Sequence, residues 1–202
     1  MVKTFFASLL ILSCAAVPKP IPEIESCSDL IRLVDVIDGD SAGLFIAELG
    51  ACAGRPVVVE INSPGGSVYA ALEIQKAIER HGAPVVCVVD GMAASAAFVT
   101  LQSCHIRAMS PRSVLMAHHA SLSGVSGQSQ EMQNAADRLR AIDEAMIRHC
   151  AKRMGMGLPE FESHVSGGRE WWLALDASKV YNAIDLEMEV GEALELIRNR
   201  KP

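Results

Sequence analysis

An apolar run at residues 84–89 passes directly into a stretch of glycine, alanine and serine at residues 90–97, and this junction restricts the fold more than any other part of the chain. An uninterrupted apolar run of this length is typical of a strand buried on both faces of a parallel sheet. The small residues let the backbone turn sharply into a short buried helix, expected over residues 96–102. Such a turn displays the hydroxyl of Ser95 at a helix N-terminus, where free N–H groups favour a developing oxyanion. Because small residues also simply allow tight helix packing, the motif alone leaves both interpretations open.

Strands and helices alternate along the first half of the chain. We expect strands over residues 31–37, 56–61 and 84–89, with helices over residues 42–49 and 68–80 between them. Strand–helix alternation at this spacing predicts parallel βαβ units in an α/β fold.

A long helix is predicted over residues 128–154, after two short strands at residues 105–109 and 113–116. Apolar residues recur along it at steps of three and four. At 1.5 Å per residue it is roughly 40 Å long, more than one domain needs to cover its own sheet. The pattern indicates either a subunit contact or a helix that faces its own core.

The N-terminus has the plan of a secretory signal peptide over residues 1–16, with a positive charge, an apolar run and then small residues. We expect cleavage at the end of this segment and export to the periplasm or the medium, with a cytoplasmic location as the alternative. The same segment resembles a bacterial lipobox, which would make Cys14 a lipidated first residue. Residues 17–30 are predicted to be an extended lead-in, and residues 31–202 a single domain.

The composition indicates which partners and metal sites are unexpected and how the cysteines are used. The net charge is −6, and the chain has no basic cluster, which argues against a nucleic-acid partner. The six cysteines include no CxxC pair, which argues against a zinc site. In an exported protein, Cys27 and Cys52 are placed to form a disulfide across the first strand–helix unit. Cys87 lies within an apolar strand and is predicted to be a buried thiol.

Three groups at predicted strand ends carry candidate chemistry. Residues 62–66, Asn-Ser-Pro-Gly-Gly, form either an ordinary turn or one that exposes a backbone N–H. Ser95 follows the central strand, and His118 and His119 follow a later one. A serine, a histidine and a later carboxylate can form a nucleophile, base and orienting acid, although a histidine at a strand end is often purely structural.

Five motifs occur together, in an order and spacing that resemble the proteolytic subunit of Clp protease, the ClpP family. They lie at residues 61–68, 91–96, 116–118, 124–128 and 181–185. The resemblance extends over roughly residues 31–188. It implies a ClpP/crotonase-like α/β fold of repeated β-β-α units with a long handle helix.

The resemblance also implies a serine endopeptidase that forms an acyl-enzyme on peptides or unfolded proteins. Ser95 falls on the family's nucleophile and His118 on its general base, with His119 as the second choice. Glu170 falls on the position of the catalytic aspartate, which is a departure from the family. The backbone N–H groups of Gly66 and Ala96 fall on the oxyanion hole. The residues implied to contact substrate are Gly65, Gly124, Val125 and Ser126.

The family assembles as heptameric rings, often two stacked rings, and its members usually work with an ATP-driven unfoldase. We expect homo-oligomers here, no metal or organic cofactor, and an unfoldase partner only if the protein is cytoplasmic. The chain has no GxxxxGK[ST] motif, so any use of ATP would be a partner's.

Three alternatives stay open. Glu170 and the missing proline after the histidine pair suggest a non-catalytic scaffold subunit. An exported relative of signal-peptide peptidases would need a lysine base, but no lysine lies between Lys76 and Lys152. An acyl-CoA enzyme of the crotonase type would leave Ser95 and His118 unexplained.

Overall fold

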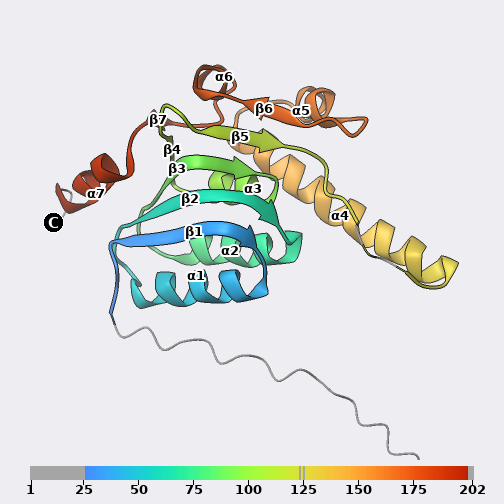
Figure 1. Ribbon diagram of the computed structural model, residues 1–202, viewed down its shortest axis with the longest axis horizontal. Helices are drawn as coiled ribbons and strands as arrows, with labels where there is room; N and C mark the ends of the chain where they lie inside the picture. Colours follow the sequence, from blue (N-terminus) through green and yellow to red (C-terminus); the bar gives the residue numbers. More distant parts are fainter. Residues whose placement is uncertain (1–25, 123, 125, 200–202) are drawn as a thin grey trace, which may run out of the picture.

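A single parallel-dominated sheet organises the molecule (Figure 1). The computed structural model describes residues 26–122, 124 and 126–199. The predicted signal peptide, Cys14, most of the lead-in and Val125 lie outside the described residues. Five parallel strands form the main sheet in this order: β1 (Leu30–Ile37), β2 (Val57–Gly66), β3 (Val85–Ala94), β4 (Ile106–Met109) and β7 (Leu186–Glu187).

Two further strands continue the sheet past the end of β4, beside the last residues of β3. β5 (Val114–Ala117) pairs in parallel with Met92–Ala94, and β6 (Trp171–Leu173) pairs antiparallel with β5. β3 therefore contacts β4 along its first half and β5 along its last residues. The end of β3 is central to the sheet, as its apolar sequence predicts.

Helices cover both faces of the sheet. The face below the strands in Figure 1 carries three helices: α1 (Gly39–Ala51), α2 (Val68–Arg80) and α3 (Ala96–Ser103). Their buried side chains form the larger core with those of β1–β3. α7 (Val190–Asn199) closes a smaller core with Val58, Val86 and Ala108 on the other face. The predicted α/β class is confirmed, and the helix expected over residues 68–80 has those bounds.

Helix α4 (Ser129–Arg153) follows the bounds expected for the long helix to within a residue at each end. Its buried residues all lie in the second half: Met146, Ile147, Cys150 and Ala151. The first half projects away from the sheet (Figure 1). Two short helices follow it, α5 (Leu158–Val165) and α6 (Leu175–Val180). The second half of α4 is thus a core helix, while the residues of the first half are exposed or only partly buried.

The strands run further than their sequence predicts. Residues 62–66 were expected to form a turn, but they continue β2 after a register shift, and Gly65 and Gly66 pair with the end of β1. Residues 92–94 likewise continue β3 because they pair with β5. Each unit is therefore two strand segments followed by a helix, which is how the expected β-β-α repeat takes form.

Two disulfides cross-link the described chain. Cys27 and Cys52 are joined as predicted. The prediction of a buried thiol at Cys87 is wrong, because Cys87 is joined to Cys104. α3 runs back beneath β3, so its C-cap Cys104 comes within 5.9 Å of Cys87, Cα to Cα. The free cysteine among the described residues is the buried Cys150.

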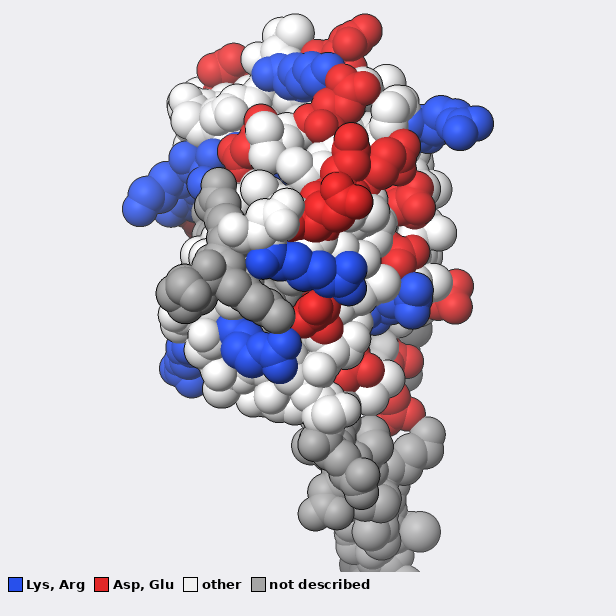
Figure 2. Space-filling model, turned by 90° about the vertical axis from the view of Figure 1, so that its left-hand side faces the viewer, with Lys and Arg blue, Asp and Glu red and all other residues white. Residues whose placement is uncertain are grey.

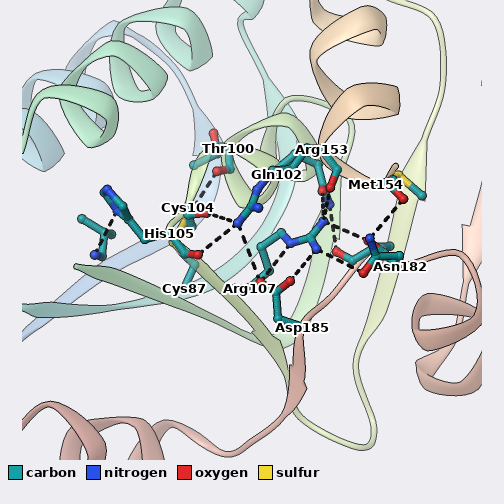
Figure 3. Close-up of polar contacts among 12 residues, drawn as sticks. Cys87, Thr100, Gln102, Cys104, His105, Arg107, Arg153, Met154, Asn182 and Asp185 are labelled. Atoms are coloured by element: carbon teal, nitrogen blue, oxygen red, sulfur yellow. Dashed lines mark hydrogen bonds and ion pairs between the residues drawn. A yellow bond between two sulfur atoms is a disulfide. The ribbon is translucent and has the colours of Figure 1, made fainter. Parts of the chain in front are cut away.

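A buried arginine ties the C-terminal segment to the sheet (Figure 3). Arg107 on β4 is 1% exposed and donates to both carboxylate oxygens of Asp185, to Gln102 and to the backbone oxygen of Asn182. Burial by itself raises the pKa of Asp185. The hydrogen bonds from Arg107 and the charges of Arg107 and Arg153 outweigh it, so the pKa lies below its usual range. The pair is therefore ionised at neutral pH and fixes the crossing from α6 to β7.

The molecular surface is mixed in charge on the face shown in Figure 2. Acidic side chains form a band across it, with Lys and Arg among and beside them. Such a face offers a polyanion no uniformly positive surface. Within the described residues no helix is both long and apolar enough to cross a membrane, and no cluster of three or more His, Cys, Asp or Glu side chains is arranged to hold a metal ion.

Candidate active site

The strand β3 ends at a sharply bent serine. Ser95 is the N-cap of α3 and has φ 56° and ψ −119°. A positive φ at a residue other than glycine costs on the order of 1–3 kcal/mol and persists only where the surroundings enforce it. Here the Ser95 N–H donates to the backbone oxygen of Met116 on β5 at 2.8 Å. The bend places the hydroxyl at the start of a helix whose residues 96–102 are buried.

The parallel pairing of β3 and β5 brings His118 to that hydroxyl. Ala94 pairs with Met116, so the residues that follow the two strands leave the sheet side by side. The Nε2 atom of His118 lies 2.8 Å from Oγ of Ser95. This is hydrogen-bond distance, as a base that activates a hydroxyl requires. The structure therefore brings together the first two residues singled out in the sequence.

The end of β2 packs directly against the serine bend. Gly65 has φ 96°, and a Cβ atom there would lie 2.6 Å from the backbone oxygen of Ala94 and 2.8 Å from Cβ of Ser95. At Gly66 a Cβ atom would lie 2.1 Å from the backbone oxygen of Ile37. Both positions therefore need glycine. Ala96 is the first residue of α3, so its N–H has no acceptor within the helix.

An apolar pocket opens beside the serine and the histidine. Asp143 is its one acidic lining residue, and Cys150, which also lines it, is fully buried. Burial raises the pKa of the Cys150 thiol well above its usual range, so it stays protonated and is a poor nucleophile. The remaining lining side chains come from α2, α3, β5, the segment after β5, α4 and α5, and they are apolar: Val68, Ala96, Phe98, Val99, Ala117, Ala120, Met146, Ile147 and Phe161.

Glu170 is not in contact with the histidine. The antiparallel register of β5 and β6 ends at Ala117 opposite Trp171, and one further step places Glu170 opposite His118. Its side chain nevertheless turns outward, where Oε2 accepts a hydrogen bond from Nε1 of Trp172 at 3.0 Å. Within the described part of the chain, the hydrogen bond recorded for the His118 ring is the one to Ser95.

A different carboxylate lies beside the histidine pair, and sequence reasoning missed it. Asp143 on α4 is 2.7 Å, through Oδ2, from Nδ1 of His119, and its Oδ1 accepts the N–H of Ala120 at 2.8 Å. Glu162 on α5 approaches Nε2 of His119 at 3.2 Å. The available signal was the position of Asp143 beside the apolar stripe of the long helix, directly after Ile142.

The predicted substrate segment is described in part. Gly124 and Ser126 are exposed, and Val125 lies outside the described residues. A groove runs from Gly66 and Ser67 between residues 121–122 and the projecting half of α4. It leads away from the end of β2, next to the serine bend.

A strained serine at a strand-to-helix bend, hydrogen-bonded to a histidine from a neighbouring strand, is the arrangement of serine hydrolases. The comparison with known proteins makes this class more specific. The family model described as Clp protease matches residues 28–189. The chain belongs to the Clp protease family.

Individual relatives agree with this. The ATP-dependent Clp protease proteolytic subunit of Porphyromonas gingivalis is 29% identical over 166 residues, which is 79% of this chain and 73% of the relative. Proteolytic subunit 1 of Chlamydia abortus is 30% identical over 136 residues, 65% of this chain and 69% of the relative. The corresponding subunit 1 of Salinibacter ruber is 26% identical over 161 residues, 77% of this chain and 68% of the relative.

Proposed function

We propose that this protein is a serine endopeptidase that hydrolyses peptide bonds in peptides or unfolded protein segments through an acyl-enzyme. The observation that carries the proposal is the 2.8 Å contact between Oγ of Ser95 and Nε2 of His118 at a strained strand-to-helix bend. Membership of a family of proteolytic subunits supports the substrate class.

The mechanism follows from the positions of these groups. Oγ of Ser95 attacks the peptide carbonyl while Nε2 of His118 takes its proton and later delivers it to the leaving amine. The N–H groups of Gly66 and Ala96 stabilise the tetrahedral oxyanion, each contributing roughly 3–4 kcal/mol when well placed. Water then hydrolyses the acyl-enzyme with His118 as base. No step requires a metal or an organic cofactor.

Glu170 is the proposed third member of the triad. Its place next to Trp171, which pairs with Ala117, supports this role, but its carboxylate must first leave the indole of Trp172 to reach the histidine ring. The outward position of Glu170 also favours a second candidate function, a non-catalytic scaffold subunit. The two differ in whether Ser95 is reactive.

We propose that the enzyme prefers substrates with an apolar side chain directly before the scissile bond. The pocket beside Ser95 is lined mostly by aliphatic and aromatic groups, and Asp143 in it is already engaged by His119 and Ala120. Burying a charged substrate side chain there would leave it without a partner, which is costly.

We also propose a homo-oligomeric ring assembled partly through the projecting half of α4, which carries the exposed Met132 and the partly buried Leu139. An export location is the companion proposal. Two disulfides, including the Cys87–Cys104 link, support it because structural disulfides persist in oxidising compartments. Outside the cytoplasm ATP is absent, so the proposed activity is ATP-independent. Native mass spectrometry tests the ring, and N-terminal sequencing of fractionated cells tests processing and location.

Peptide hydrolysis and fluorophosphonate labelling test the activity. We expect Ser95→Ala and His118→Ala to lower hydrolysis by about 10⁴-fold or more, and Ser95→Ala to abolish labelling. Ser163→Ala, at an exposed serine of α5, is the matched control and keeps wild-type rates. A folded wild-type protein that neither labels nor hydrolyses would favour the scaffold.

A further inference from the structure

The backbone that follows His118 is held by one carboxylate. β5 ends at Ala117, so residues 118–120 lie beyond the strand. Asp143 binds both residues that follow His118: Oδ1 accepts the Ala120 N–H at 2.8 Å, and Oδ2 lies 2.7 Å from Nδ1 of His119. Its side chain is 16% exposed and lines the pocket that contains Ser95 and His118.

Asp143 stands on a rigid support. It lies at the point where α4 enters the core, one turn before Met146 and Ile147, which are buried in the larger hydrophobic core. A carboxylate fixed to a buried helix holds the strand end far more firmly than a contact from a loop.

Both ring nitrogens of His119 face carboxylate oxygens, Nδ1 that of Asp143 and Nε2 that of Glu162. The ring thus links the strand end to α4 and α5. Both nitrogens of His119 are engaged by these carboxylates, whereas Nε2 of His118 lies 2.8 Å from Oγ of Ser95, which leaves His118 as the base.

We propose that Asp143 is a positioning residue for hydrolysis: it fixes residues 119 and 120 and so holds the His118 imidazole at hydrogen-bond distance from Ser95. This inference rests on the proposed function. It adds a carboxylate from the long helix to the site, distinct from Glu170 on the β6 side. A displacement of about 1 Å at a reacting group can lower the rate about 100-fold. Loss of the Asp143 contacts, which lie within two residues of His118, should therefore slow hydrolysis.

The test compares Asp143→Ala with Asp137→Ala, an exposed aspartate on the same helix whose recorded partners are Gln133 and Arg140. For Asp143→Ala we expect kcat and the rate of fluorophosphonate labelling to fall about 10- to 100-fold, with KM changed less than about twofold. Amide hydrogen exchange at Ala120 should accelerate at least about tenfold because its acceptor is gone. Asp143→Glu should recover part of kcat, and Asp137→Ala should match the wild type.

Unchanged kcat and labelling in a folded Asp143→Ala variant would overturn the inference, as would unchanged exchange at Ala120. If Asp143→Ala does not fold, His119→Ala replaces it. This half-buried residue loses its contacts with Asp143 and Glu162, while the Asp143–Ala120 hydrogen bond remains. We expect about a tenfold lower kcat, and a wild-type rate would contradict the inference. Absence of Ser95-dependent labelling in the wild type would refute the proposed function instead. In that case exchange at Ala120 still decides whether Asp143 holds the strand end.

Discussion

Replacing the Cys87–Cys104 disulfide with two alanines perturbs the chain segment that carries Ser95. The bond joins β3 to the end of α3 with a sequence separation of 17, and Ser95 lies within the loop it closes. In the chain-entropy treatment, closing a loop of this size lowers the entropy of the unfolded chain enough to stabilise the fold by about 3 kcal/mol. Both cysteines are fully buried, so alanine, rather than serine, avoids adding an unsatisfied hydroxyl.

Thermal unfolding of the oxidised protein measures this contribution. For a chain of this length, about 3 kcal/mol corresponds to a drop in Tm of roughly 6–12 °C. Mass spectrometry of the alkylated, unreduced wild type first establishes that Cys87 and Cys104 are bonded. Removing the Cys27–Cys52 link in the same way is the comparison. Its separation of 25 gives a similar, slightly larger loss of about 3.5 kcal/mol.

Two results would refute this reasoning. Free thiols at Cys87 and Cys104 in protein folded under oxidising conditions would contradict the bond. A bonded wild type whose double-alanine variant melts within about 2 °C of it would show that the loop is already ordered in the unfolded ensemble.

Three further outcomes are expected. Gly65→Ala should lower fluorophosphonate labelling more than about 100-fold because its Cβ would press on the serine bend, whereas Gly54→Ala, also at positive φ but with nothing within 4 Å, should label normally. Glu170→Gln should slow hydrolysis about 10- to 100-fold and Trp172→Phe should leave it unchanged or faster; equal rates for Glu170→Gln and the wild type would remove Glu170 from the mechanism. The lowered pKa of Asp185 means that its stabilising ion pair is complete above about pH 4 and is lost as the pH falls through that pKa. The Tm difference between wild type and Asp185→Asn should therefore be largest near neutral pH and shrink on acidification, and a difference that grows below pH 4 would contradict the sign.

Local sequence signals predicted the regular elements well. Helix α2 has its expected bounds because Ser67 caps its first turn and its apolar residues face the sheet at helical spacing. The buried strand before Ser95 and the short helix after it were also expected, since apolar runs and small residues describe burial directly. The Ser95–His118 contact was anticipated from the family resemblance rather than from spacing.

The features that were missed depend on contacts between distant residues. Residues 62–66 contain proline and two glycines and therefore predict a turn, yet the end of β1 supplies partners that keep them in the sheet. Cys87 meets Cys104 only because α3 folds back beneath its own strand. Asp143 meets His119 across a separation of 24 residues, and no local pattern specifies that approach. Glu170 directly precedes the last residue of β6 that pairs with β5, but its carboxylate is hydrogen-bonded to the indole of Trp172, which no local pattern predicts.

The division of α4 into a buried and a projecting half determines where along the helix substitutions affect stability. Substitutions before Ile142 alter a surface that holds no part of the core together, so the fold should tolerate them at little thermodynamic cost. Protein engineers can therefore redesign the outer turns of this helix, in length or in charge, without changing the buried residues that hold the serine bend in place.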